Sequence, residues 1–155
     1  MTNIITLRDV TQDDLPILFE HQLDPQAAKM AAFPSRDWDA FTAHWTKIMA
    51  NEKVITKTIL LDGQVAGSLA CFEMDEKLEV GYWIGREFWG MGIASESLRQ
   101  FLGQVSMRPL HAHVARHNIA SQRVLQKCGF EVSGEDKWTP SPEIGEIEEL
   151  IFLLR

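Results

Sequence analysis

Apolar and polar positions follow two different spacings along this chain, and the spacings predict strands and helices in turn. Residues 2–8 alternate loosely and indicate a first strand. A helix is expected next, because Asp13 or Asp14 can cap it and the following apolar residues form one face. Prolines within residues 24–35 break the next stretch, and a second helix is expected over residues 37–50.

The rest of the chain carries stronger signals for both kinds of element. The dipeptide Asp62-Gly63 is typical of a two-residue hairpin. Helical spacing of apolar residues from Ala94 to Val105 predicts one helix, while Asn118 and Gly129 are suited to begin and end another. Strands are expected at residues 54–61, 64–72, 77–84, 110–114, 130–138 and 146–154. Strands with helices between them indicate a mixed α/β domain around one sheet.

The composition fits one globular domain over residues 1–155, since 45% of the residues are hydrophobic and 24% are charged. No apolar run approaches the roughly 18–20 residues of a membrane-spanning helix. Residues 1–4 do not resemble the start of a signal peptide. Cys71 and Cys128 have no metal-ligand spacing and form no disulfide framework. We therefore expect a soluble, cytoplasmic protein with no membrane partner.

The charge balance argues against a nucleic-acid partner. The formal net charge is −7, from 15 Lys+Arg and 22 Asp+Glu, and no basic run interrupts the acidic excess. The acids are concentrated over residues 131–155, where Lys137 and Arg155 are the basic residues. Two interpretations stay open for this segment: a solvated hairpin face, or an electrostatic field that attracts a cationic substrate.

The most informative stretch runs from Glu79 to Ala94, where a predicted strand enters a glycine-containing loop that opens a helix. Backbone N–H groups at such a helix start bind anions, and Gly90 and Gly92 let a phosphate approach the backbone closely. A purely structural turn explains the two glycines equally well. The spacing does not match a P-loop, and the third small residue of a dinucleotide-binding fold is missing.

The stretch from Glu79 to Ser97 resembles the acetyl-CoA-binding motif of the GCN5-related N-acetyltransferase (GNAT) superfamily. The family signature Arg/Gln-x-x-Gly-x-Gly/Ala corresponds to residues 89–94, Trp-Gly-Met-Gly-Ile-Ala, with Trp89 at the Arg/Gln position. A tryptophan there is similar to the branch that acetylates ribosomal-protein alanines and other N-terminal amines. A second stretch, residues 118–130, resembles the family's Asn-x-x-Ser … Gly-Phe helix.

This resemblance implies an α/β (α+β) fold, a single mixed, mostly antiparallel splayed sheet of about 6–7 strands flanked by about 4 helices. It also implies acetyl-CoA as co-substrate, held by the end of a strand and by the amides of the glycine loop. The residues that it implies for this role are Trp83, Ile84, Gly85, Arg86, Trp89, Gly90, Met91, Gly92, Ile93, Ala94, Asn118 and Ser121. Arg86 fits a surface role equally well, and Asn118 fits a helix cap.

Acetyl transfer to an amine needs a base for the amine and a donor for the leaving thiolate. Glu79 is the first candidate base, because it stands within an otherwise apolar strand, and Glu143 and Glu146 are second candidates. Many GNAT proteins carry a tyrosine as acid at the position that is Leu125 here. The resemblance to the N-terminal amine branch implies Ser121 as the acid instead.

Other candidate residues have weaker signals. Tyr82 is the only tyrosine and belongs to the first motif, so the usual proton donor of the second motif is missing. His111 and His113 share a strand face and are expected to face an acceptor cleft; no metal is expected, because no carboxylate or thiolate completes a ligand set. Trp38 and Trp45 are expected in the core or as lining of an acceptor pocket.

We therefore predict an acetyl-CoA-dependent N-acetyltransferase that acts by direct transfer in a ternary complex. The acceptor is a primary amine, either a protein N-terminal α-amine or a small cationic amine such as a polyamine. A homodimer is an expectation from the family alone. The alternative is a non-catalytic acyl-CoA-binding or regulatory module, which the missing tyrosine leaves open. A generic nucleotide-phosphate binder is disfavoured, because two separate motifs point to the GNAT fold.

Overall fold

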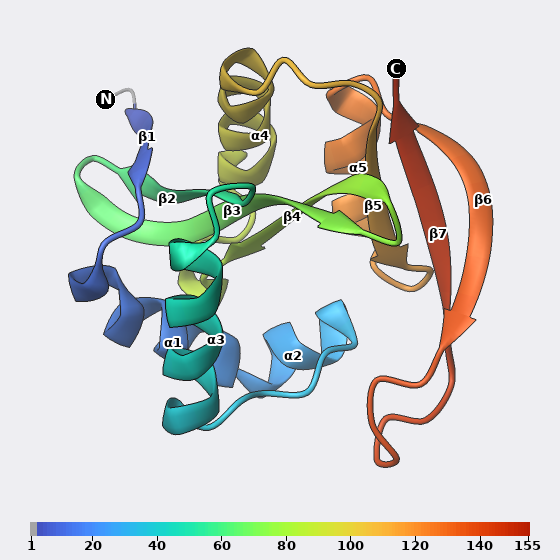
Figure 1. Cartoon of the computed structure of the whole chain (residues 1–155), viewed down its shortest axis with the longest axis horizontal. Coiled ribbons are helices and arrows are strands. Elements are labelled where there is room, and N and C mark those ends of the chain that lie inside the picture. The colour runs from blue at the N-terminus through green and yellow to red at the C-terminus, as the bar shows by residue number, and fades with distance from the viewer. Residues whose placement is uncertain (1–2) are drawn as a thin grey trace.

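A computed structural model describes residues 3–155 and contains a seven-stranded sheet with the strand order β1-β2-β3-β4-β5-β7-β6 (Figure 1). Every neighbouring pair is antiparallel except β4 and β5, which are parallel. The mixed, mostly antiparallel sheet that the sequence predicts is therefore confirmed. The strands are β1 (Ile5–Asp9), β2 (Ile55–Leu61), β3 (Gln64–Met74), β4 (Lys77–Ile84), β5 (Leu110–Ala115), β6 (Glu131–Trp138) and β7 (Ile147–Leu154).

Helices cover both faces of the sheet. In Figure 1, α4 and α5 lie on one face, and α1, α2 and α3 lie on the other. The connection from β6 to β7 extends toward the side of α2. Over residues 3–155 the α-helices are α1 (Leu15–Leu23), α2 (Pro25–Ala31), α3 (Trp38–Ala50), α4 (Ile93–Gln104) and α5 (Ile119–Lys127), and two 3-10 turns are η1 (Gln12–Asp14) and η2 (Arg86–Phe88).

Local chemistry explains the elements that the sequence predicts well. Asp62 and Gly63 both have positive φ, 51° and 85°, which a tight hairpin between twisted strands requires. The side chain of Asn118 accepts a hydrogen bond from the backbone N–H of Ser121 at 3.2 Å and so caps α5. Gly129 follows α5 with φ 92°, as expected for a residue just past a helix end.

Helix α2 is absent from the sequence-based prediction, which treated Asp24-Pro25 as a break. In the structure Asp24 is the cap, and its carboxylate accepts hydrogen bonds from the N–H groups of Gln26 and Ala27. Pro25 fits the first turn of a helix, because its missing N–H has no partner there in any case. The first strand begins at Ile5; position 2 of its predicted range lies outside the described residues.

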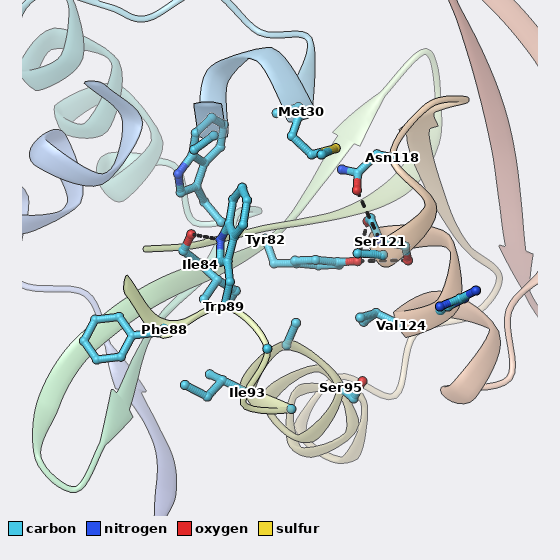
Figure 2. Close-up of a pocket in the computed structure, with 18 of the residues that line it drawn as sticks. Met30, Tyr82, Ile84, Phe88, Trp89, Ile93, Ser95, Asn118, Ser121 and Val124 are labelled. Atoms are coloured by element: carbon cyan, nitrogen blue, oxygen red, sulfur yellow. Dashed lines mark hydrogen bonds between the residues drawn. The ribbon is translucent and has the colours of Figure 1, made fainter. Parts of the chain in front are cut away.

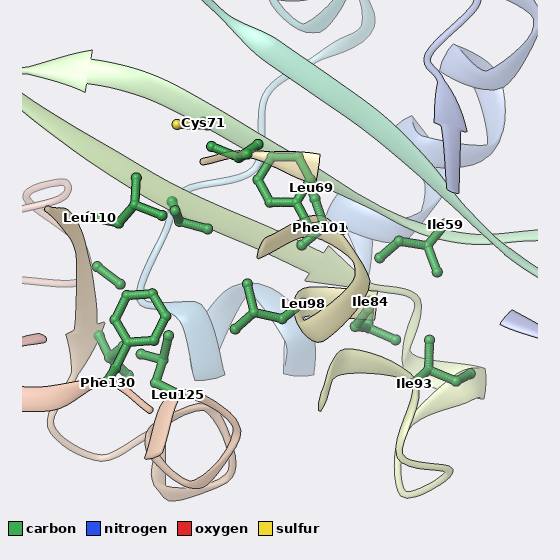
Figure 3. Close-up of a cluster of buried hydrophobic side chains, with 14 of the residues drawn as sticks. Ile59, Leu69, Cys71, Ile84, Ile93, Leu98, Phe101, Leu110, Leu125 and Phe130 are labelled. Atoms are coloured by element: carbon green, nitrogen blue, oxygen red, sulfur yellow. The ribbon is translucent and has the colours of Figure 1, made fainter. Parts of the chain in front are cut away.

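The main core fills the space between the sheet and the helices α4 and α5 (Figure 3). Leu98 and Phe101 on α4 are fully buried there, as is Leu125 on α5. A second, smaller cluster on the other face joins α1, α3 and Val10, and it includes Trp45. Trp45 is therefore part of the core, and the alternative that it lines an acceptor pocket is wrong.

The strands β4 and β5 pair at one position only, Glu79 opposite His111, whereas β3 and β4 pair over eight positions from Gly67 to Met74. The backbone of β4 from Val80 to Ile84 therefore has no ladder partner on β5. This divergence confirms the splayed sheet that the family resemblance implies, and it leaves room for a ligand beside the end of β4.

Candidate functional site

A cavity of about 600 Å³ opens beside the end of β4, between α4, α5 and α2 (Figure 2). Its walls come from segments that are far apart in the sequence and that the splayed sheet brings together. The lining residues are Ala27, Met30, Ala31, Tyr82, Trp83, Ile84, Phe88, Trp89, Gly90, Gly92, Ile93, Ala94, Ser95, Asn118, Ala120, Ser121, Arg123, Val124 and Lys127.

The start of α4 is one end of this cavity. Gly90 and Gly92 have φ values of 77° and 74°, a left-handed conformation that glycine adopts without strain. Gly92 is the N-cap and offers no side chain, so the first N–H groups of the twelve-residue helix have no side-chain cap. The indole N–H of Trp89 donates to the backbone carbonyl of Ile84 at 3.0 Å and holds the loop against β4. This end of the cavity is suited to a phosphate group.

Two hydroxyl groups meet on the wall formed by β4 and α5. The phenol oxygen of Tyr82 lies 2.6 Å from Oγ of Ser121, as the dashed line in Figure 2 shows. Burial raises the pKa of Tyr82 to about 12, so the phenol keeps its proton at neutral pH. Asn118, which caps α5, lines the same wall. The wall formed by β4 and α5 therefore carries two hydroxyls and an amide, together with the basic side chains of Arg123 and Lys127.

Tyr82 and Ser121 lie in different sequence motifs, so neither motif alone predicts their contact. The strand pattern contained the necessary signal. Tyr82 alternates with Val80 and Ile84, whose side chains belong to the main core, so all three face α4 and α5. Leu125, where the family resemblance leads us to expect a tyrosine, is fully buried in the core, away from the cavity wall.

Glu79 belongs to the opposite face of β4, because three positions separate it from Tyr82. Glu79 is 3% exposed, and one of its carboxylate oxygens lies 3.0 Å from Nδ1 of His113. Glu149 on β7 adds a third titratable group, and burial raises its pKa. His111 and His113 are half-buried and alternate with buried residues along β5, so they share a face, as predicted; whether that face borders an acceptor cleft stays a prediction. Within residues 3–155 no group of three possible ligands is arranged to hold a metal ion.

Most residues that the resemblance implies for acetyl-CoA line the cavity, but three do not: Gly85, Arg86 and Met91. The N–H of Gly85 donates to the carbonyl of Ala66 at 2.8 Å, which fixes the strand end. Arg86 forms an ion pair with Asp24 at 3.4 Å. Met91 is exposed.

The candidate bases Glu143 and Glu146 are both exposed, on the connection between β6 and β7. Neither forms a hydrogen bond or ion pair within the part of the chain that the structure describes. Their carboxylates are therefore not held in a fixed position, whereas the carboxylate of Glu79 is held by His113.

Within residues 3–155, no helix is long and apolar enough to span a membrane.

Comparison with models of protein families identifies the family to which the chain belongs. The model of the acetyltransferase (GNAT) domain matches residues 5–131, which is most of the chain. The protein belongs to the GNAT family. This confirms the family that the two sequence motifs predict, and the names of its relatives support the predicted N-acetyltransferase activity.

Among curated GNAT relatives, YdaF of Bacillus subtilis, provisionally named a ribosomal N-acetyltransferase, is 28% identical over 98 residues. That alignment covers 59% of this chain and 54% of YdaF, so the chain matches about half of YdaF's length. Among solved structures, spermidine N-acetyltransferase from Vibrio cholerae, in complex with CoA and spermine, has a TM-score of 0.80 at 16% identity and covers 96% of this chain and 95% of that one. RimJ of Mycobacterium smegmatis, in complex with CoA-disulfide, has a TM-score of 0.80 at 21% identity, and the match covers 97% of this chain and 81% of RimJ. These structures share the fold.

Proposed function

We propose that this GNAT protein binds acetyl-CoA in the cavity beside β4 and transfers the acetyl group directly to a primary amine in a ternary complex. The proposal rests on one observation: the end of β4, which has no partner on β5, lies next to the start of α4, which has no side-chain cap. A thioester with a long amide-containing arm and a pyrophosphate suits this junction. The edge of β4 at Trp83 and Ile84 that has no partner on β5 would bind the arm, and the N–H groups from Gly90 to Ala94 would bind the pyrophosphate.

The transfer forms a bond between the amine nitrogen and the acetyl carbon and breaks the bond from that carbon to the CoA sulfur. The amine must lose a proton, and the developing oxyanion needs a donor, for which a backbone N–H near Trp83 is suited. We assign proton removal to Glu79 together with its hydrogen-bonded partner His113. We assign stabilisation of the leaving thiolate to the hydroxyl of Ser121, which Tyr82 holds on the cavity wall.

The thiolate needs a hydrogen-bond donor more than a proton source. A phenol with a pKa of about 12 is a weaker acid than a thiol of ordinary pKa near 8.5, so full proton transfer from Tyr82 is uphill. When the Tyr82 hydroxyl donates to Oγ of Ser121, the hydrogen of Ser121 is free to point to the ligand. Two side chains thus supply the donor that position 125 cannot supply.

The acceptor class follows from the family and from charge. The relative from Vibrio cholerae was solved with spermine, and YdaF carries a name that refers to ribosomal acetylation. A polyamine and a protein N-terminus are both cationic amines before they react. Acidic side chains are dense on β6 and β7: Glu149 lies near the Glu79–His113 pair, and Asp136 lies opposite Glu149. We therefore propose a cationic primary amine as the acceptor.

A non-catalytic acyl-CoA-binding module is the second candidate, because Leu125 replaces the tyrosine that many relatives use as acid. The two candidates differ in one measurable property. An enzyme releases CoA only when acetyl-CoA and an amine are both present. A binding module takes up acetyl-CoA and releases no CoA with any amine.

Calorimetric titration with acetyl-CoA, CoA and ATP tests the donor site, and a CoA-release assay over polyamines and alanine-ending peptides then tests transfer. We expect micromolar affinity for acetyl-CoA and no binding of ATP. The variant Ser95→Glu places a negative charge at the start of α4 and should weaken acetyl-CoA at least tenfold. Gln104→Glu adds the same charge at the other end of α4 and is the matched control. Absence of acetyl-CoA binding to the unmodified protein would refute the proposal.

A further inference from the structure

Glu79 is poorly placed to contact an acceptor amine itself. It is 3% exposed, so an amine or a water molecule has little access to its carboxylate. One of its oxygens is already engaged by Nδ1 of His113 at 3.0 Å. The exposed face of this pair belongs to His113, whose side chain is 22% exposed.

The imidazole of His113 has the accessible basic atom. Its Nδ1 faces Glu79, and its other ring nitrogen, Nε2, is neither buried nor hydrogen-bonded within residues 3–155. The ring lies two residues beyond His111, the last position at which β5 pairs with β4. It therefore stands where the two strands diverge. The same divergence exposes the strand end to which the proposed thioester arm binds.

We infer that His113 is the catalytic base that takes the proton of the acceptor amine, and that Glu79 is a positioning residue that fixes its ring. This inference rests on the proposed function. A carboxylate that accepts a hydrogen bond from Nδ1–H fixes the neutral ring in the tautomer whose lone pair is at Nε2. The ammonium form of the acceptor first releases one proton to solvent, and the neutral amine then attacks. As the nitrogen–carbon bond forms, the second proton on the attacking nitrogen moves to Nε2. The electron pair of the carbon–sulfur bond leaves with the CoA sulfur.

The surrounding charges favour this division of roles. Glu79 faces the ring from β4, and Glu149 lies near it on β7, with Asp136 on β6 close to Glu149. These carboxylates stabilise the imidazolium that forms when the proton arrives. On the same strand, His111 is a second imidazole, and its Nδ1 is buried and without a hydrogen bond in residues 3–155.

Helix α2, which packs against β5, brings one further charge, Lys29. Its backbone carbonyl accepts a hydrogen bond from Nε2 of His117 at 3.0 Å.

The first test needs no turnover. Nitrogen-15 NMR of histidine-labelled protein distinguishes a neutral ring protonated at Nδ1 from one protonated at Nε2. We expect His113 to be protonated at Nδ1 in the unmodified chain and to lose this preference in Glu79→Gln, whose amide can donate to Nδ1. A neutral His113 protonated at Nε2 in the unmodified chain would overturn the assignment.

The second test measures kcat for CoA release at saturating acetyl-CoA. His113→Asn keeps an N–H donor for Glu79 but removes the base, so we expect kcat to fall by about 10²–10⁴-fold. The affinity for acetyl-CoA should stay within about twofold. His44→Asn, on α3, is the matched control and should change kcat little.

The outcomes distinguish failure of the proposed acetyltransferase activity from failure of His113 as its base. An unmodified protein that releases no CoA with any amine refutes the proposed function, and the assignment of His113 with it. An active protein in which His113→Asn keeps the original kcat refutes the assignment of His113 alone. Recovery of activity in His113→Ala on addition of free imidazole would support His113 as the base.

Discussion

Removal of one hydroxyl group from the cavity wall tests whether Tyr82 and Ser121 act as a pair. Tyr82→Phe keeps the ring in place and deletes the partner of a 2.6 Å hydrogen bond. A hydrogen bond of this kind contributes about 0.5–1.5 kcal/mol net to the free energy of unfolding. Ser121 lines the cavity, where water can replace the lost partner, so we expect a loss of about 1 kcal/mol.

The reverse deletion should be more costly. Ser121→Ala leaves the buried phenol of Tyr82 with only its longer hydrogen bond, to the backbone carbonyl of Ser121 at 3.3 Å, and a poorly satisfied buried polar group costs about 1–3 kcal/mol. The double variant removes both hydroxyls, so neither is left without its short partner. Its loss should therefore be smaller than the sum of the single losses by about 1 kcal/mol, as measured by urea denaturation of all four proteins.

The same set of proteins tests the proposed chemistry. If Tyr82 orients the hydroxyl of Ser121 toward the leaving thiolate, a contribution of about 1 kcal/mol in the transition state corresponds to a fall in kcat of about fivefold in Tyr82→Phe. Ser133→Ala deletes a hydroxyl on β6, far along the sheet, and its effects should simply add to those of Tyr82→Phe. Additive losses for Tyr82 and Ser121, together with an unchanged kcat in Tyr82→Phe, would refute the pairing.

Two further predictions concern stability. Hydrogen bonds and the Arg8 charge lower the pKa of the buried Asp14 from 3.8 to about 2, so this carboxylate stabilises the fold by about 2 kcal/mol above pH 4 and loses that effect as the pH falls toward 2. Asp14→Asn should lower the free energy of unfolding by that amount at pH 7 and converge with the parent protein near pH 2; parallel curves from pH 7 to 2 would contradict this. A Cβ on Gly85 would lie 2.6 Å from the ring of buried His21, so Gly85→Ala should lower the free energy of unfolding by about 1–3 kcal/mol, measured by thermal or urea unfolding. Gly81→Ala is the control and should cost less, because the nearest atom to its Cβ would be 3.7 Å away. Equal losses in the two variants would show that the His21 ring moves aside without cost.

The features predictable from the sequence are those encoded by neighbouring residues. The hairpin at Asp62 and the cap at Asn118 each depend on the conformation of two to four consecutive residues, which residue type determines locally. Helix α2 was missed because Asp-Pro has two local meanings, a break or a capped helix start. Contact of α2 with α1 and β5 selects the second meaning, and such contacts are not visible in a window of sequence.

The pairs within the candidate site depend on the register of strands and could not be read in the same way. Tyr82 and Ser121 are 39 residues apart, and Glu79 and His113 are 34 apart. The Glu79–His113 pair exists because β4 and β5 run parallel with Glu79 opposite His111, whereas the Tyr82–Ser121 pair joins β4 to helix α5. A shift of the register by one residue would turn every side chain of β4 to the other face. The sequence could supply the candidates, but only the fold could supply their partners.

Alternation along β4 then separates the two proton-handling tasks in the proposed reaction. Tyr82 projects toward α5 and Glu79 projects to the other face, three residues away on the same strand. A hydrogen-bond donor for the thiolate and an acceptor for the amine proton are thereby held on opposite sides of one rigid backbone. They do not contact each other, so a proton taken from the amine is not returned to the thiolate through side chains. It follows that Tyr82→Phe and His113→Asn should depress kcat independently, with a double variant equal to the product of the two effects within about twofold. If kcat of the double variant equals that of His113→Asn alone, the two groups act in one shared proton relay, and β4 does not separate them as its geometry implies.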